Sequence, residues 1–258
     1  MDVPFYLIDA FAHDPFTGNP AGVCLCSVEP GTDWMQKVAW EINQAETAFV
    51  WPVRSKTYGL RWFTPTVEVD LCGHATLASY HALGEEGNVT FETKSGNLTC
   101  WRTESKVTLD FPVKIVEPQD TPRAAQDMFL GADIWFGKND LDWFVEFKNE
   151  DSVLSFQPDH TVIASLGCRG MVITAPANTI RADFISRFFA PGSGVPEDFV
   201  TGSAHCALAP FWSERLGKTD LVGYQASQRG GFVEVGVRGG RVWLSGSART
   251  VVSGTLSA

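Results

Sequence analysis

The chain has 258 residues, of which 44% are hydrophobic and 19% charged, as is usual for a globular protein. The formal net charge of −10, without any basic run, argues against binding to nucleic acid, and no apolar segment has the length of a membrane helix. The start of the chain lacks the basic region of a secretory signal, and the six cysteines show no metal-binding spacing. We therefore expect a cytoplasmic protein with reduced thiols and no metal.

The first half of the sequence predicts strands around two helices. A strand over 4–11, a turn-rich loop over 14–22 and a strand over 23–28 precede a helix that Asp33 can cap, with Met35, Val38 and Ile42 on one face. The segments that follow are expected to be strands over 46–52, 59–64 and 67–71, an almost wholly apolar helix over 74–83, and three hairpin strands over 89–94, 97–103 and 106–111.

The second half repeats this order. Arg187–Pro191 resembles Arg61–Pro65, and each is followed by an aspartate, a glycine turn and the start of a helix. Asp70 is matched with Asp198. The segment from Pro191 to Gly202 is longer than the segment from Pro65 to Gly73, which indicates a small insertion in the second copy. The expected elements are a helix over 160–167, strands over 170–176 and 184–191, a helix over 204–216, and strands over 223–228, 231–237 and 241–245.

This duplication predicts two halves of an α+β protein, each with mostly antiparallel strands around a central helix. The N-terminal half is expected to cover 1–112, with residues 248–258 returning to it, and the C-terminal half to cover 113–247. Loops over 131–139 and 191–197 are expected to shape the site.

The two glycine turns are candidate anion sites. Gly73 and Gly202 allow a ligand to approach the backbone closely, and the N–H groups of 73–76 and 202–205 have no partner inside a helix. The alternative is ordinary capping by Asp70, Asp198, Thr201 or Ser203. Capping and binding are compatible, so both interpretations stay open.

Three side-chain types near these turns could move a proton. Glu46, at the mouth of an apolar strand, would be partly desolvated, which raises the pKa of a carboxyl toward neutrality, unless it is merely exposed. His74 and His205 lie near positive helix ends, which favour neutral imidazole. Cys72 precedes its glycine where a thiol pKa is lowered, and its counterpart in the second copy is Thr201. A buried inert cysteine and structural histidines are the alternatives.

Four long motifs resemble the phenazine-biosynthesis PhzF family. They occur in the family's order from the N-terminus to residue 210, and they are Asp9–Phe11 with Phe16–Pro20, Gln44–Phe49, Arg61–Pro65 through Asp70–Thr76, and Thr201–Pro210. One departure is Phe199, where the family usually has proline after the aspartate.

The resemblance implies a diaminopimelate-epimerase-like fold with a site between two similar domains. It also implies a cofactor-independent isomerase that moves a proton within a small cyclic or amino-carboxylate substrate. The implied catalytic residues are Glu46, His74 and Asp198, and Cys72 and Thr201 are possible accessory groups. The implied substrate-binding residues are Asn19, Gly73, Ala75, Gly202, Ser203 and Ala204.

Two other functions remain open at this point. One is a one-base amino-acid epimerase or dehydratase that uses Cys72, because related racemases place a cysteine before each glycine. The other is a non-catalytic protein that binds a small carboxylate. In each case we expect a small-molecule carboxylate partner, and exposed hairpin edges make a homodimer plausible.

Overall fold

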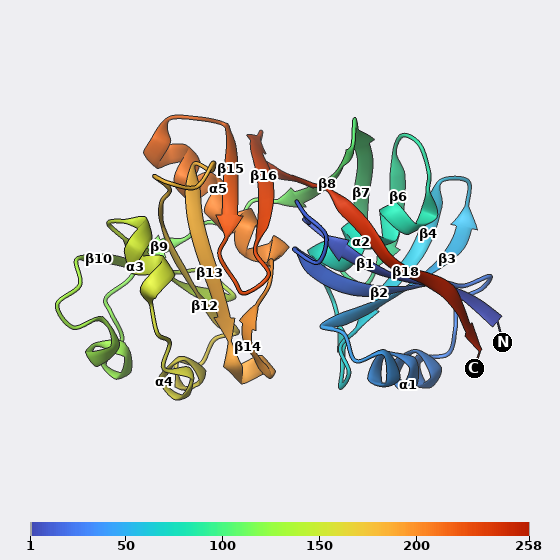
Figure 1. Ribbon diagram of the computed structural model, residues 1–258, viewed down its shortest axis with the longest axis horizontal. Coiled ribbons are helices and arrows are strands. Elements are labelled where there is room, and N and C mark those ends of the chain that lie inside the picture. The colour runs from blue at the N-terminus through green and yellow to red at the C-terminus, as the bar shows by residue number, and fades with distance from the viewer. Residues whose placement is uncertain (1, 258) are drawn as a thin grey trace. The chain divides into compact units, whose positions relative to one another are not determined.

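The chain forms two compact units, which the computed structural model describes for residues 2–257 (Figure 1). Unit 1 contains the chain up to Phe111 together with the residues from Trp243 onward, and unit 2 is Pro112–Val242. The expected halves met at 112 and 113, and the C-terminal segment was expected from 248; residues 1 and 258 of those spans lie outside the described residues. No helix within 2–257 has both the length and the apolar character that a membrane crossing requires.

Unit 1 is built on one twisted sheet that is mostly antiparallel. The pairings give the order β18-β1-β2-β3-β4-β6-β7-β8, in which β2–β3 and β4–β6 are parallel. The bounds are β1 Asp2–Ala10, β2 Asn19–Leu25, β3 Glu46–Arg54, β4 Thr57–Phe63, β5 Glu68–Val69, β6 Val89–Thr93, β7 Gly96–Thr103, β8 Lys106–Pro112, β17 Arg241–Gly246 and β18 Ala248–Ser257.

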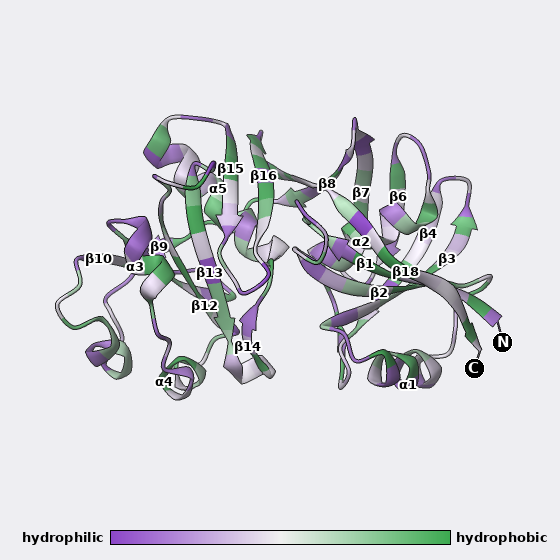
Figure 2. Ribbon diagram, viewed as in Figure 1, coloured by the Kyte–Doolittle hydropathy of each residue, from purple (hydrophilic) through white to green (hydrophobic). Residues whose placement is uncertain are grey.

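The central helix of unit 1, α2 (Gly73–Leu83), packs against β1, β2 and β3. Its residues from His74 to Tyr80 are all buried, as the apolar sequence predicted. The other helix, α1 (Thr32–Ile42), is amphipathic, with hydrophilic and hydrophobic residues alternating along its turns (Figure 2). The expected cap at Asp33 is wrong. Gly31 is the N-cap, and Asp33 lies inside the first turn, where its negative charge interacts favourably with the positive end of the helix dipole.

Unit 2 repeats the same sheet pattern. Its order is β9-β10-β11-β12-β13-β15-β16, with β11–β12 and β13–β15 parallel. The strand bounds are β9 Glu117–Pro118, β10 Ile134–Lys138, β11 Asp142–Phe147, β12 Gly170–Pro176, β13 Phe184–Ala190, β14 Val195–Asp198, β15 Asp220–Gln225 and β16 Gly231–Arg238. The expected loop over 131–139 is wrong in part, because Ile134–Lys138 pairs with β11 as a strand.

The helices of unit 2 pack against this sheet. Its longest helix, α5, contains Pro210, which cannot donate a hydrogen bond to the carbonyl of Cys206. The backbone N–H of Lys114 donates to that carbonyl instead, at 3.2 Å, so the interior proline leaves no unpaired acceptor there. The bounds are α3 Glu150–Ser155, α4 His160–Ser165 and α5 Gly202–Leu216, with 3₁₀ turns η1 Arg123–Ala125, η2 Asp127–Phe129 and η3 Pro191–Ser193.

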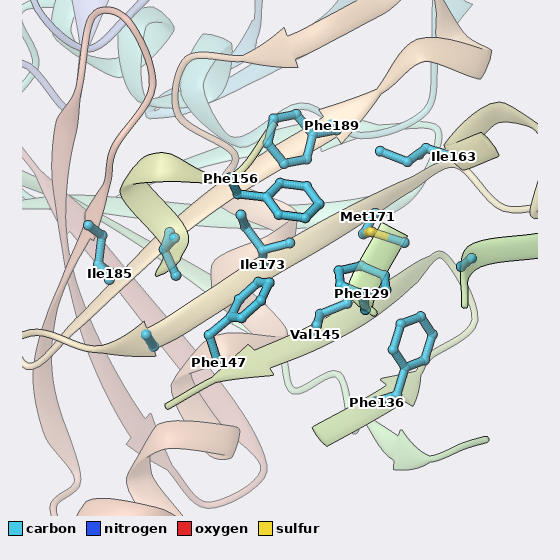
Figure 3. Packing of buried hydrophobic residues seen from close by; sticks show 13 residues of the cluster. Phe129, Phe136, Val145, Phe147, Phe156, Ile163, Met171, Ile173, Ile185 and Phe189 are labelled. Carbon is cyan, nitrogen blue, oxygen red and sulfur yellow. The ribbon is translucent and has the colours of Figure 1, made fainter. Parts of the chain in front are cut away.

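A phenylalanine-rich core holds α3, α4 and η2 against β10–β13. Phe129 stacks on Phe156 with ring centroids 5.6 Å apart, and Phe147 and Phe189 contact Phe156 from two strands (Figure 3). Phe189 is completely buried. Each ring of this kind contributes roughly 1.5–3 kcal/mol by burial alone, so the cluster fixes the helices on one face of the sheet.

The strand registers align the two copies residue by residue. Glu46 pairs with Ala21 in the parallel β2–β3 ladder, and Gly170 pairs with Asp142 in the equivalent β11–β12 ladder. Thr47 opposite Phe63 is likewise repeated by Met171 opposite Phe189. Glu46 and Gly170 therefore occupy equivalent positions.

The same registers correct one alignment made from the sequence. Arg61 binds Glu68 and Arg187 binds Glu197, with an Nε–Oε1 distance of 2.7 Å in both ion pairs. Trp62 pairs with Val69, and its counterpart Phe188 pairs with Asp198. The equivalent of Asp198 is thus Val69, not Asp70, because the extra residues of the second copy lie before Glu197, in the segment that contains η3.

Candidate functional site

Glu46 and His74 meet in unit 1. Glu46 is the first residue of β3, and its side chain is 21% exposed, so the carboxylate is partly but not wholly removed from water. His74 lies in the first turn of α2, with a buried side chain. Its Nε2 approaches Oε2 of Glu46 to 3.3 Å, although the two are not aligned as in a good hydrogen bond.

The opposite edge of the imidazole, at Nδ1, lies against Asn19 and Cys72. The Asn19 Nδ2 atom lies 3.3 Å from Nδ1 of His74, and the Cys72 Sγ atom lies 3.6 Å from it. Both are donors to an unprotonated ring nitrogen. Nδ1 therefore acts as the acceptor, and the single ring proton of neutral His74 is placed on Nε2, the nitrogen that faces Glu46.

Burial keeps His74 neutral. It lowers the pKa of His74 from the usual 6.5 to about 3, because the charged imidazolium would lose its hydration. At neutral pH the ring is thus a hydrogen-bond donor and not a counter-ion for Glu46.

The starts of α2 and α5 lack side-chain caps. The N-cap residues are Cys72 and Thr201, and neither side chain accepts a hydrogen bond from the helix, whereas Asn149 and Asp159 cap the short helices α3 and α4. Within residues 2–257 the backbone N–H groups of 73–75 and 202–204 have no hydrogen-bond partner. The capping alternative is therefore wrong, and these donors remain available to an anion.

In unit 2, a chain of hydrogen bonds leads to Asp198. The Gln225 side chain donates from Nε2 to Thr201 Oγ1 at 3.1 Å and accepts from the Thr201 backbone N–H at 2.8 Å. The Thr201 hydroxyl in turn donates to Oδ2 of Asp198 at 2.5 Å. The carboxylate of Asp198 is oriented by this chain, and the hydroxyl of Thr201 is committed to it.

Ser203 has a different neighbour. The guanidinium of Arg169 donates from Nη1 to Ser203 Oγ at 2.8 Å, and it also donates through Nε and Nη2 to the carboxylate of Asp142, which is buried. Sequence reasoning missed Arg169, Asp142 and Gln225. The available signal for Asp142 and Gln225 was a polar residue at one terminus of a largely apolar strand.

The predicted site residues thus fall into two groups. Asn19, Glu46, Cys72 and His74 are in contact in unit 1. Asp198 contacts Thr201, and Ser203 contacts Arg169, in unit 2. Gly73, Ala75, Gly202 and Ala204 offer only backbone N–H groups.

Glu46, Cys72 and His74 also present one possible metal ligand each, and these atoms lie within 4.8 Å of one another. Carboxylate, thiolate and imidazole are ligands that zinc accepts. The two ring nitrogens face different partners, however, so one nitrogen cannot meet both Glu46 and Cys72 without rotation of the ring.

His205 and the remaining buried cysteines have a structural role. His205 donates from Nδ1 to the carbonyl of Thr201 at 2.8 Å, and burial lowers its pKa to about 4. Burial raises the pKa of Cys26 to about 11 and of Cys206 to about 12, and it raises that of Cys24 and Cys100 as well. These thiols stay protonated and unreactive.

The fold assigns the protein to a broad structural class. The fold is α+β and of the diaminopimelate epimerase-like class. A hydroxyproline epimerase from Agrobacterium vitis, solved with bound trans-4-hydroxy-L-proline, shares this fold at a TM-score of 0.67 and 11% identity, over 99% of this chain and 92% of that one.

Closer similarities show the family. A model described as phenazine biosynthesis-like protein matches residues 8–254, so the chain belongs to the PhzC-PhzF family. An uncharacterized isomerase of Halalkalibacterium halodurans is 42% identical over 99% of both chains. A phenazine biosynthesis protein of the PhzF family from Enterococcus faecalis has a TM-score of 0.93 and 37% identity, over 100% of both chains.

Proposed function

We propose that the protein is a cofactor-independent isomerase that moves a proton within a small cyclic or amino-carboxylate substrate. The observation that carries this proposal is the contact between Glu46 and His74. A partly buried carboxylate lies 3.3 Å from the Nε2 atom of a neutral imidazole, the nitrogen that carries the ring proton. Such a pair can take a proton from carbon and return it elsewhere. Relatives named isomerases support the reaction class.

In this proposal Glu46 is the general acid and base. The uncapped N–H groups at 73–75 and 202–204 bind the substrate carboxylate and stabilise the negative charge that develops when the adjacent C–H loses its proton. His74, held by Asn19, donates to the substrate or relays the proton. Asp198 and Ser203 orient the substrate's polar groups.

A second candidate is supported by Cys72. Its Sγ atom lies 3.6 Å from Nδ1 of His74, so a thiol and a possible proton acceptor are in contact. A one-base epimerase or dehydratase would use this thiolate in place of Glu46. Thr201 is the counterpart of Cys72 in the second copy, and its hydroxyl donates its proton to Asp198, which disfavours a two-base epimerase.

Solvent exchange distinguishes these functions. A panel of small cyclic carboxylates and amino acids is incubated with enzyme in heavy water, and deuterium incorporation is followed by mass spectrometry for wild type, Glu46→Gln and Cys72→Ala. Loss of exchange in Glu46→Gln alone supports the isomerase with a glutamate base. Loss in Cys72→Ala alone supports the thiol enzyme. Binding by panel members without exchange in any of them supports a non-catalytic carboxylate-binding protein.

A further inference from the structure

Arg169 is held in place by two contacts in unit 2. It binds Asp142 through Nε and Nη2, in a two-pronged contact that fixes the plane of the guanidinium. Its face lies over the ring of Phe188, with Cζ 5.1 Å from the ring centroid. Because Asp142 is 1% exposed, this end of the pair is shielded from water, whereas the side chain of Arg169 is 32% exposed and can be reached by a ligand.

The duplication places this cation next to the position that is equivalent to Glu46. Gly170 is the equivalent of Glu46, and a Cβ at 170 would lie 2.6 Å from both the Phe188 ring and the Phe189 carbonyl oxygen. The second copy therefore cannot carry a glutamate at that position. Its preceding residue, Arg169, supplies a charge of opposite sign. The first copy presents a carboxylate near the start of its central helix, and the second copy presents a guanidinium.

The contact with Arg169 gives the Ser203 hydroxyl a direction. A guanidinium nitrogen can only donate a hydrogen bond, so Ser203 Oγ accepts from Nη1 at 2.8 Å. The hydroxyl proton of Ser203 is therefore directed away from Arg169. Among residues 2–257, Ser203 donates this proton to no acceptor, and the side chain is only partly buried. Thr201 differs, because its proton goes to Asp198.

We propose that Arg169 is a positioning residue, which acts through Ser203 by holding its hydroxyl as a hydrogen-bond donor for the carboxylate of the substrate. Asp142 keeps the guanidinium in the required plane. The inference rests on the proposed function, in which Ser203 binds a small carboxylate. It adds that the hydroxyl at the start of α5 binds the negative charge in an orientation that the guanidinium of Arg169 sets.

The test measures binding and not turnover. Isothermal titration uses anthranilate, cyclohexanecarboxylate and proline, each paired with its analogue lacking the carboxylate: aniline, cyclohexane methanol and pyrrolidine. Wild type, Arg169→Met, Arg169→Lys, Ser203→Ala and the double variant Arg169→Met with Ser203→Ala are compared. Arg181→Met, at an exposed position in the same unit, is the matched control.

We expect Arg169→Met to weaken carboxylate binding about 10- to 100-fold, with no change for the analogues. Once Ser203 is alanine, the further loss caused by Arg169→Met should shrink to less than about 3-fold, because the two residues act together. Arg169→Lys should restore part of the affinity. The inference is overturned if Arg169→Met causes the same loss of affinity in wild type and in Ser203→Ala. It is also overturned if wild type binds no carboxylate more tightly than its analogue.

The outcome is separable from that of the proposed function. Glu46→Gln should retain carboxylate binding that depends on Arg169, whatever its effect on exchange. If Glu46→Gln exchanges deuterium as fast as wild type, the proposed chemistry fails while the role of Arg169 can stand. If binding is indifferent to Arg169 while exchange still needs Glu46, the role of Arg169 fails alone.

Discussion

Glu46 and Gly170 occupy the same position in the two copies of the sheet, yet only one of them carries a side chain. Each begins the strand that runs parallel to its neighbour, β2 for Glu46 and β11 for Gly170. The phenylalanines of β13 fill the space where a side chain at 170 would lie. The duplicated fold is thus chemically asymmetric for a steric reason.

This crowding predicts the effect of a single methyl group. Gly170→Ala should lower the free energy of unfolding by about 1–3 kcal/mol, because the backbone carbonyl of Phe189 cannot move aside as a flexible side chain would. Urea denaturation measures the change. Gly192→Ala is the control, since a Cβ there meets no atom within 4 Å, and it should change stability little. Equal stability of the two variants would contradict the steric explanation.

The second prediction concerns the acid and base. Glu46→Gln should reduce the rate of deuterium exchange about 10²- to 10⁴-fold, the usual contribution of a general acid or base, while the melting temperature changes little at this partly exposed position. Exchange is measured by mass spectrometry on any panel substrate that wild type labels.

Glu41→Gln is the matched control, because this glutamate lies exposed on α1. It should exchange at the wild-type rate. A Glu46→Gln variant that folds normally and keeps full exchange would remove Glu46 from the mechanism.

The third prediction follows from the hydrogen-bond chain through Thr201. Thr201→Val removes the donor to Asp198 and one of the two acceptors of the Gln225 amide, which keeps its bond to the Asp198 carbonyl. We therefore expect kcat/KM to fall about 10-fold and stability to fall by about 1–3 kcal/mol. Thr201→Ser keeps the hydroxyl and should recover most of the activity. Steady-state kinetics on the exchange substrate measures both variants, and equal activity of valine and serine variants would refute the orienting role.

Much of the fold follows from local sequence. β12 was expected over 170–176 and is found there, because an apolar run between glycine and proline has clear ends. β10 was missed, since Trp135 and Phe136 follow a loop with glycine and aspartate, and the strand is held by pairing with β9 and β11, which no local pattern indicates.

The site was predicted less completely, because its contacts join distant segments. The family motifs named Glu46 and His74 separately, but nothing local indicates that they lie 3.3 Å apart. Arg169 precedes a glycine and looks like a surface residue; only the parallel register that brings Gly170 beside Asp142 explains its contact with that carboxylate. Asp198 was aligned with Asp70 because residue identity is visible in a sequence, whereas strand register is not.

The last prediction concerns acid stability. Burial lowers the pKa of His74 to about 3 and of His205 to about 4, and it also lowers that of His81, whereas each histidine in the unfolded chain keeps a value near 6.5. Below pH 6.5 the unfolded state therefore binds protons that the native state does not. The stabilisation is fully present above pH 6.5 and is lost as the pH falls toward 4 for His205 and 3 for His74.

Each of these two histidines contributes up to about 1.4 kcal/mol per pH unit within its window, so the free energy of unfolding should fall steeply between pH 6.5 and 4.5. Urea titrations at four pH values measure this slope. His205→Asn, which can still donate to the carbonyl of Thr201, should make it markedly shallower, whereas His13→Asn, in an exposed loop, should leave it unchanged. Stability that is flat over this range, or a slope indifferent to His205→Asn, would show that the imidazoles titrate equally in both states.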